Sequence, residues 1–346
     1  MRTTRIFFIL FVLTGLIVNS PSVLYADLPK AKKIIKLATL APDGVGWSVY
    51  LKKEFAPAIS KATEGEVLFK FYWGGVMGDD EDYLAKMKID QLQAAGVSAA
   101  GIVMACPDIA VFELPFLFNN FEEVAYIRDK LRPKFNLTFE KNGFKLLILI
   151  DQGFDLPWST KRKLINPEDF INSKFLTWCA PIGQNLLKSL GVSPIPVDVP
   201  EVPQSMRSGV ANAFLAPPIY LLGTQLYTIV KYVTPCKIRY SPGGIMLSTK
   251  AWNSISDKSQ KAIEKIMPRL EHKLNKVGHK TNKNSYKAMV KYGVEEVKLT
   301  SDDLDTLKKL SIPLWDKLAG DKYPKTLLDE IIKNLKEFRD IKGQPK

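Results

Sequence analysis

The segment from residue 67 to 88 constrains the fold of this chain more than any other, because it fixes a strand, a turn and a helix in one order. Apolar residues occupy every second position over residues 67–71, which predicts a strand with one buried face. Three glycines within residues 74–78 predict a sharp turn, since glycine adopts backbone conformations that other residues avoid. The acidic residues 79–82 then offer charge and hydrogen-bond acceptors to the unpaired amides of a helix start. We therefore expect a helix that runs through Lys88.

Strand and helix signals alternate along most of the chain, which predicts an α/β fold with a mostly parallel sheet. A strong apolar strand over residues 144–150 is followed by polar and glycine residues at 151–153, which predicts a crossover into a second α/β region. Strand and helix signals recur up to residue 216, and residues 229–246 return the chain to the first region. A chain of 346 residues, 46% of them apolar, is long enough for two substantial cores.

The N-terminal residues have a different pattern from the rest of the chain. Arginines at positions 2 and 5 precede a run over residues 6–18 that is almost entirely apolar, and Ala26 follows a proline turn. This pattern predicts a secretory signal peptide over residues 1–26, cleaved after Ala26, and hence a periplasmic protein. The apolar run is too short to span a bilayer comfortably, although an uncleaved N-terminal anchor stays an alternative.

The motifs disfavour an enzyme or a metalloprotein. The sequence contains no G-x-S-x-G, no H-E-x-x-H and no glycine-rich phosphate loop. Its two histidines and three cysteines form no metal-binding pattern, so we predict no catalytic residue, no metal and no cofactor. Cys106, Cys179 and Cys236 are odd in number and far apart for an exported protein. Buried thiols are the favoured interpretation, and one disulfide stays open.

Basic residues give the chain a net charge of +13, and ten of them recur every three or four positions between Lys258 and Lys291. This spacing predicts one stripe along a helix, with a kink at Pro268. A solvated helix face is the favoured interpretation. The alternative is a surface for anionic lipid headgroups or an acidic partner. Nucleic acid is disfavoured as a partner by the export signal and by the lack of aromatic residues between the lysines.

Several separated segments carry motifs that occur together, and in the same order, in one known family. The segments are residues 37–47, 72–79, 114–118, 151–154, 189–197, 205–213 and 245–256. Together they resemble the solute-binding subunits of TRAP transporters, the DctP-like family, from about Ile34 to the C-terminus. The glycine turn with Asp79 and the Leu-Pro-Phe corner at residues 114–116 are the most specific of these motifs.

The resemblance implies a type II periplasmic-binding-protein fold, with two α/β lobes, crossover strands between them and a ligand cleft where the lobes meet. The expected lobe I comprises residues 27–151 and 241–285, and the expected lobe II comprises residues 152–240 and 286–346. Such clefts close on the ligand by a hinge motion. The resemblance also implies a non-catalytic subunit that captures a small solute and delivers it to membrane permease subunits.

In the family that this chain resembles, an arginine holds the carboxylate of the ligand, because its planar fork pairs with both carboxylate oxygens. This chain has Leu176 at the arginine position, Asp155 where the family has a cation and Ala216 where it has an asparagine. A buried carboxylate without a cation would cost roughly several kcal/mol or more. The chain is therefore similar to a branch of the family that lacks the usual carboxylate-binding arginine.

Large apolar side chains lie beside the positions where these polar groups are missing, which predicts an apolar cleft. We expect a small, largely apolar solute, with Gln152, Thr177 or Tyr220 orienting one polar end. For Trp73 and Phe214, packing in the core is an equal alternative. The predicted ligand-binding residues are Trp47, Trp73, Gln152, Phe154, Leu176, Trp178, Phe214, Ala216, Pro217 and Tyr220.

A conventional organic-acid binding subunit, with another cation as its clamp, is the alternative function. Arg239, on the predicted crossover strand, is the better candidate for that clamp, because Arg207 lies on a helix where packing or capping explains it. In the family that this chain resembles, some members of arginine-lacking branches are associated with tetratricopeptide-repeat proteins. The resemblance therefore also implies a periplasmic partner of that kind.

Overall fold

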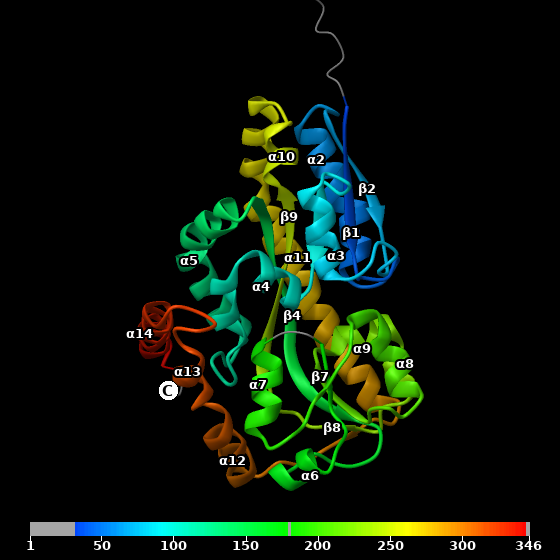
Figure 1. Cartoon of the computed structure of the whole chain (residues 1–346), viewed down its shortest axis with the longest axis vertical. Helices are drawn as coiled ribbons and strands as arrows, with labels where there is room; N and C mark the ends of the chain where they lie inside the picture. The colour runs from blue at the N-terminus through cyan, green and yellow to red at the C-terminus, as the bar shows by residue number, and fades with distance from the viewer. Residues whose placement is uncertain (1–31, 179–180, 344–346) are drawn as a thin grey trace, which may run out of the picture. The chain divides into compact units, whose positions relative to one another are not determined.

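The computed structural model describes residues 32–178 and 181–343, and Figure 1 shows the arrangement of its elements. The predicted signal peptide, residues 1–26, and Cys179 lie outside the described residues. The strands are β1 Lys33–Thr39, β2 Val67–Tyr72, β3 Ala94–Val97, β4 Phe144–Ser159, β5 Leu176–Thr177, β6 Ile195–Pro196, β7 Ala213–Ala216, β8 Tyr232–Val233, β9 Arg239–Ser248 and β10 Glu295–Glu296.

Helices connect most of these strands, as the alternating pattern predicts. The α-helices are α1 Trp47–Tyr50, α2 Ala56–Ala62, α3 Asp80–Lys88, α4 Ala99–Ala105, α5 Phe121–Lys141, α6 Pro167–Ile171, α7 Pro181–Ser189, α8 Val202–Arg207, α9 Pro218–Thr224, α10 Thr249–Asn253, α11 Asp257–Lys291, α12 Ser301–Ser311, α13 Leu314–Leu318 and α14 Lys325–Lys342. Four further segments are the π-helix η1 Leu51–Phe55 and the 3-10 helices η2 Pro107–Glu113, η3 Val199–Glu201 and η4 Leu226–Thr228.

The main sheet is mixed rather than mostly parallel, so that part of the sequence prediction is wrong. Its strand order is β10-β8-β4-β9-β3-β1-β2, and β7 also pairs with β4. β1 is parallel to β2 and β3, whereas β9 is antiparallel to both β3 and β4. The reason is that β9 returns from the second group of strands and runs back along β4, a path that only an antiparallel ladder allows.

Two long strands connect the two groups of elements and confirm the predicted crossover (Figure 1). The ladder between β4 and β9 extends from the pair Phe144 and Ser248 to the pair Asp155 and Arg239. Beyond that point β4 pairs with β7 and β8. β4 therefore continues nine residues past the strand end expected at Ile150, because both of its halves lie in buried ladders.

The acidic helix start behaves as its sequence predicts. Asp79 is the N-cap of α3, and its side chain forms a reciprocal capping box with Asp82. Gly78 precedes it with φ of 101°, and a Cβ added there would lie 2.1 Å from an Asp82 carboxylate oxygen. The glycine is thus required both for the turn and for the close approach of the capping carboxylate.

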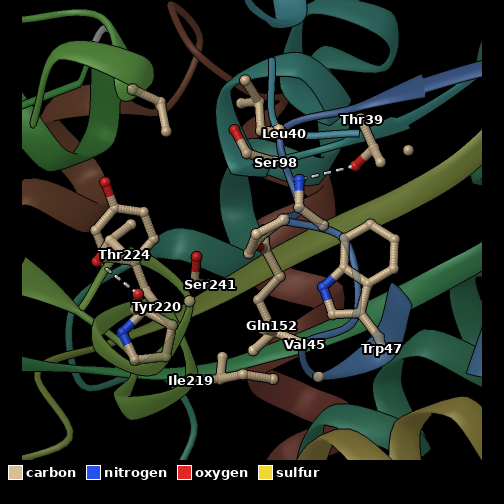
Figure 2. Close-up of a pocket in the computed structure, with 18 of the residues that line it drawn as sticks. Thr39, Leu40, Val45, Trp47, Ser98, Gln152, Ile219, Tyr220, Thr224 and Ser241 are labelled. Atoms are coloured by element: carbon tan, nitrogen blue, oxygen red, sulfur yellow. Dashed lines mark hydrogen bonds between the residues drawn. The ribbon is translucent and has the colours of Figure 1, made fainter. Parts of the chain in front are cut away.

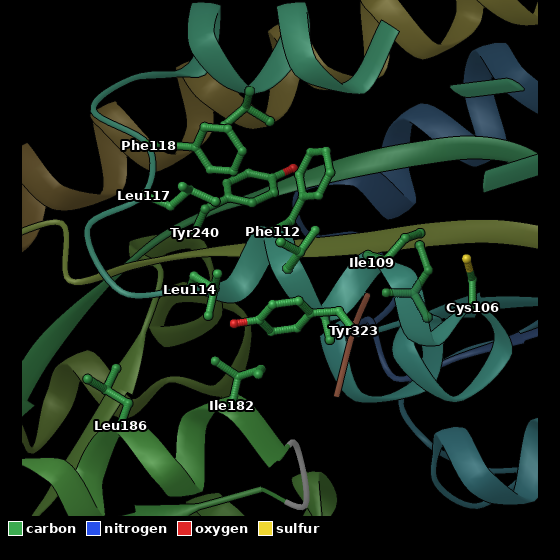
Figure 3. Packing of buried hydrophobic residues seen from close by; sticks show 14 of the residues in the cluster. Cys106, Ile109, Phe112, Leu114, Leu117, Phe118, Ile182, Leu186, Tyr240 and Tyr323 are labelled. Atoms are coloured by element: carbon green, nitrogen blue, oxygen red, sulfur yellow. The ribbon is translucent and has the colours of Figure 1, made fainter. Parts of the chain in front are cut away.

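Side chains of η2 and the following corner fill the region beside the crossover strands, as Figure 3 shows. Phe112 lies 5.5 Å from Phe135 and 6.3 Å from Tyr240 between ring centroids. The same core cluster includes Ile182 of α7 and Tyr323. Cys106 and Cys236 are buried free thiols, which agrees with the favoured interpretation for these two cysteines.

Helix α11 braces the crossover, because it hydrogen-bonds to β4 along much of its length. Asn275 accepts from the Asp151 amide at 2.9 Å and donates to the Leu149 carbonyl at 3.0 Å. Asn282 donates to the Gln152 carbonyl at 2.8 Å and accepts from the Ile219 amide of α9 at 3.0 Å. The helix passes through Pro268 as one element, and its lysine side chains are exposed.

Candidate functional site

A pocket of about 290 Å³ lies beside the crossover strands. The loop after β1 and the start of α1 form one wall, together with Ser98 at the start of α4. Val199, Pro200 and Pro203 form the opposite wall together with helix α9, and Gln152 and Ser241 of the crossover strands lie between the two walls. Its volume suits a small organic molecule.

Aromatic rings occupy both walls. Figure 2 shows Trp47 and Tyr220 on opposite sides of the pocket, with Gln152 and Ser241 between them. Trp47 opens α1 directly after Gly46, whose φ is 60°, and a Cβ added at Gly96 would lie 3.2 Å from its ring. The glycine at position 96 therefore leaves room for the Trp47 indole against the sheet. On the opposite wall, the Trp178 ring lies 5.4 Å from that of Tyr220, at an interplanar angle of 46°.

The polar groups that line the pocket are uncharged. Gln152 donates its Nε2 to the Pro242 carbonyl at 2.7 Å, and among the described residues none donates to its Oε1. The Ser241 hydroxyl likewise has no hydrogen-bond partner within the described part of the chain. No aspartate, glutamate, lysine or arginine side chain lines the pocket in residues 32–178 and 181–343. The lining can therefore exchange hydrogen bonds with a ligand but cannot neutralise an anion.

Arg239 is committed to other partners and is not among the lining residues, which argues against it as a clamp. Its Nε lies 2.8 Å from an Asp155 oxygen, and its Nη1 lies 2.7 Å from a Glu113 oxygen. All three side chains are almost completely buried. Burial raises the pKa of Glu113 to about 7, although the nearby guanidinium favours the charged form. Two carboxylates thus surround one guanidinium.

The backbone amides at the start of α4 are also occupied. The Asp80 carboxylate accepts from the Ser98 amide at 3.1 Å and from the Gly101 amide at 3.2 Å, and it also accepts from the Ser98 hydroxyl. The Ala100 amide donates to the Ser98 hydroxyl at 3.2 Å. Asp80 is buried, and desolvation raises its pKa from 3.8 to about 7. A protein carboxylate therefore already holds the amides that an anionic ligand would need.

This raised pKa predicts a pH dependence of stability. The pKa of Asp80 is higher in the folded protein than in the unfolded chain. Its contribution to the free energy of unfolding is therefore fully present below pH about 4 and is lost as the pH rises through about 7. We expect Asp80→Asn to make the decline in the free energy of unfolding between pH 5 and 8 shallower. Urea denaturation across this range measures the slope, and equal slopes for the two proteins would contradict the assignment.

The structure brings five of the ten predicted ligand-binding residues together around the pocket. These five are Trp47, Gln152, Trp178, Pro217 and Tyr220. They come from α1, from the crossover, from the strand end after β5 and from the start of α9, which are far apart in sequence. Residues predicted from separate segments of the sequence therefore meet around one pocket, and their role in binding stays a prediction.

The other five predicted residues lie outside the lining of this pocket. Trp73 stacks on Phe71 with 4.7 Å between ring centroids. Phe154 packs between Phe121 and Tyr240, at 5.0 and 5.8 Å. The remaining three, Leu176, Phe214 and Ala216, are buried in the core beside the pocket. The Ala216 carbonyl accepts a hydrogen bond from the Trp158 indole at 2.9 Å.

Several lining residues were not predicted from the sequence. Ser98, Ile219 and Ser241 contribute to the pocket through short or aliphatic side chains. Ser98 carries one sequence signal, since a serine before an apolar run favours a helix N-cap. Val199 is placed there by an inter-segment hydrogen bond of 3.3 Å, from its amide to the Asp79 carboxylate. No local pattern marks that contact.

In residues 32–178 and 181–343, no group of three or more histidine, cysteine, aspartate or glutamate side chains is placed to hold a metal ion. Within the same ranges, no helix combines the length and the apolar character needed to cross a membrane.

Two α/β lobes, crossover strands and a pocket where they meet define a two-lobed solute-binding protein. Residues 38–321 match the family described as DctP, bacterial extracellular solute-binding protein, family 7, and the chain belongs to that family. The resemblance to TRAP transporter solute-binding subunits and the predicted fold class are thereby confirmed.

The relatives of this chain are distant in sequence and similar in fold. The C4-dicarboxylate-binding periplasmic protein DctP of Rhodobacter capsulatus is 22% identical over 307 residues, covering 88% of this chain and 86% of that protein. A sugar acid binding protein of Advenella mimigardefordensis in complex with galactonate superposes with a TM-score of 0.83 at 19% identity, covering 89% of this chain and 99% of the other. A TRAP periplasmic solute binding protein of Haemophilus influenzae with bound L-gulonate gives 0.81 at 22% identity, covering 88% and 99%.

Proposed function

We propose that this protein captures a small, uncharged and largely apolar solute in the pocket between its lobes and delivers it to the membrane permease subunits of a TRAP transporter. The observation that carries the proposal is the lack of any charged side chain in the lining formed by the described residues. An acid buried there would lose its hydration without gaining a cation. Trp47, Trp178 and Tyr220 offer apolar surface instead.

Gln152 and Ser241, which lie between the two walls of the pocket, suit the polar end of the ligand. Gln152 Oε1 accepts hydrogen bonds, and the Ser241 hydroxyl both donates and accepts. An amide, hydroxyl or ketone group matches such neutral partners. Thr177, which the sequence also suggested, donates to the Trp178 carbonyl at 3.2 Å and is not in the lining.

We also propose the boundaries of the two lobes, the location of the protein and its partners. Lobe I comprises residues 27–151 and 241–285, and lobe II comprises residues 152–240 and 286–346. Export through a cleavable signal places the protein in the periplasm, where a tetratricopeptide-repeat protein is a further partner. The family membership supports the extracytoplasmic location and the partnership with a permease.

Organic-acid binding is the second candidate, because the relatives bind such compounds: the Rhodobacter protein is named for C4-dicarboxylates, and the two structures contain galactonate and L-gulonate. One cation lies near the pocket. Arg207 donates to the carbonyl of Thr224, a lining residue, at 3.2 Å, and its side chain is exposed. A rearranged Arg207 is therefore the clamp that this function would use.

Mass spectrometry under native conditions on protein purified from its own periplasm tests the proposal directly. We expect a retained, neutral and hydrophobic small molecule, and calorimetry with that molecule should give tight binding. The Arg207→Gln variant should bind it equally well, since the proposed site uses no cation. Tight binding of succinate or galactonate that is lost in Arg207→Gln would overturn the proposal in favour of the second candidate.

A further inference from the structure

The C-terminal half of α11 presents a row of lysines that the solute site does not use. Its members are Lys276, Lys280, Lys283, Lys287 and Lys291, which we call the lysine row. All five side chains are exposed, and their spacing of three or four residues places them on one side of the helix. At 1.5 Å per residue the row is about 22 Å long. The opposite side of α11 packs on β4 and α9, as Figure 1 indicates.

The lysine row has no counter-charge within the described residues. None of its five ammonium groups has a carboxylate within 4.0 Å in that part of the chain, and residues 272–294 contain no acidic residue. By contrast, Lys258 and Lys273, nearer the start of the helix, pair with Glu64 and Glu54.

The carboxylates that follow the lysine row are already engaged. Glu295 pairs with Lys163 at 2.5 Å, and Glu296 accepts from the Tyr286 hydroxyl. Helix α9, which packs on this half of α11, contains no charged residue at all. Positive charge therefore accumulates here without compensation, which raises the local attraction for anions.

We propose that the lysine row binds the anionic headgroup surface of a phospholipid bilayer. The composition of the row favours a lipid surface over a protein partner. Protein interfaces are enriched in arginine and depleted in lysine, whereas the row contains lysine only. Lysine ammonium groups are mobile point charges that suit a diffuse layer of phosphates, with no fixed geometry to match. A straight row on a helix needs no complementary groove.

An exposed aromatic residue at the end of the row fits the same partner. Tyr292 follows Lys291 and is 83% exposed, and the Lys291 ammonium lies 5.8 Å from the centroid of its ring. A tyrosine offers an apolar ring and a polar hydroxyl, which suits the boundary between headgroups and acyl chains. On the bilayer, the row would hold the protein beside its permease by charge and Tyr292 would add apolar contact.

Vesicle co-sedimentation of the purified full chain tests the proposal. We expect binding to vesicles of equal parts phosphatidylcholine and phosphatidylglycerol, weakening as ionic strength rises, and no binding to phosphatidylcholine alone. The triple variant Lys280→Gln, Lys283→Gln, Lys287→Gln should bind about 100-fold more weakly, since each lysine near an anionic surface contributes about fivefold. Tyr292→Ala should weaken binding severalfold even at high ionic strength.

A triple variant with the same net charge is the control. Lys134→Gln, Lys250→Gln and Lys325→Gln remove three lysines that pair with Glu330, Asp90 and Asp329 elsewhere on the protein. This control should retain vesicle binding, and thermal melts should show that both variants fold. Equal losses in the two variants would overturn the proposal, because net charge alone would then explain binding. Failure of the unmodified protein to prefer the anionic vesicles, or equally tight binding to polyglutamate, would also overturn it.

Discussion

Arg239→Met should lower the free energy of unfolding by about 3–5 kcal/mol, because it leaves two buried carboxylates without their cation. Arg239 is 3% exposed, and its guanidinium lies within 2.8 Å of both Asp155 and Glu113. Arg239 lies in β9, Asp155 in β4 and Glu113 at the end of η2, so their ion pairs connect these three elements at the crossover. Urea denaturation of the purified protein at pH 7 measures the change.

A matched variant and a rescue separate this effect from a general loss of arginine. Arg207→Met removes an exposed guanidinium that donates to the Thr224 carbonyl, and it should change stability by less than about 0.5 kcal/mol. Adding Glu113→Gln and Asp155→Asn to Arg239→Met should recover part of the loss, since no buried charge then stays unpaired. A loss below about 1 kcal/mol in Arg239→Met would show that the two carboxyls are protonated or hydrated without the arginine.

Local patterns predicted the elements of this fold well. The strand predicted over residues 67–71 begins at Val67 and ends one residue later than expected, and the helix after Asp79 is capped by the acidic residues that predicted it. Both depend on interactions within a few residues, namely alternation along a strand and side-chain acceptors at a helix start. The direction of β9 depends on a return from the far group of strands, and nothing within its ten residues encodes that.

Five of the ten predicted ligand-binding residues line the pocket and five do not, for a similar reason. Trp178 lines the pocket, whereas Leu176, two positions earlier, is buried at 1% exposure in the core. The strand β5 ends between them, so the alternation of faces gives no guide. Arg239 illustrates the same limit for charge, since its partner Glu113 lies 126 residues away. Which side chains face a cavity is decided by contacts between distant segments.

Trp178→Ala should weaken binding of the native solute on the order of 100-fold. The loss of about 100 Å² of apolar contact at ~25 cal/mol per Å² corresponds to roughly 2.5 kcal/mol. Trp178 lines the pocket and packs on Tyr220, so its removal opens one wall. Isothermal titration calorimetry with the solute released from the native protein measures the change.

Two further variants separate a contact with the solute from a general loss of packing, because Trp178 also belongs to a buried cluster. Trp47→Ala, on the opposite wall, should weaken binding by a similar factor through an independent part of the fold. Trp73→Ala removes an indole that stacks on Phe71 outside the pocket, and it should leave affinity within about twofold. Unchanged affinity in Trp178→Ala and Trp47→Ala, with normal thermal melts, would show that the solute binds elsewhere, because an apolar ligand in this pocket must touch at least one of the two indoles.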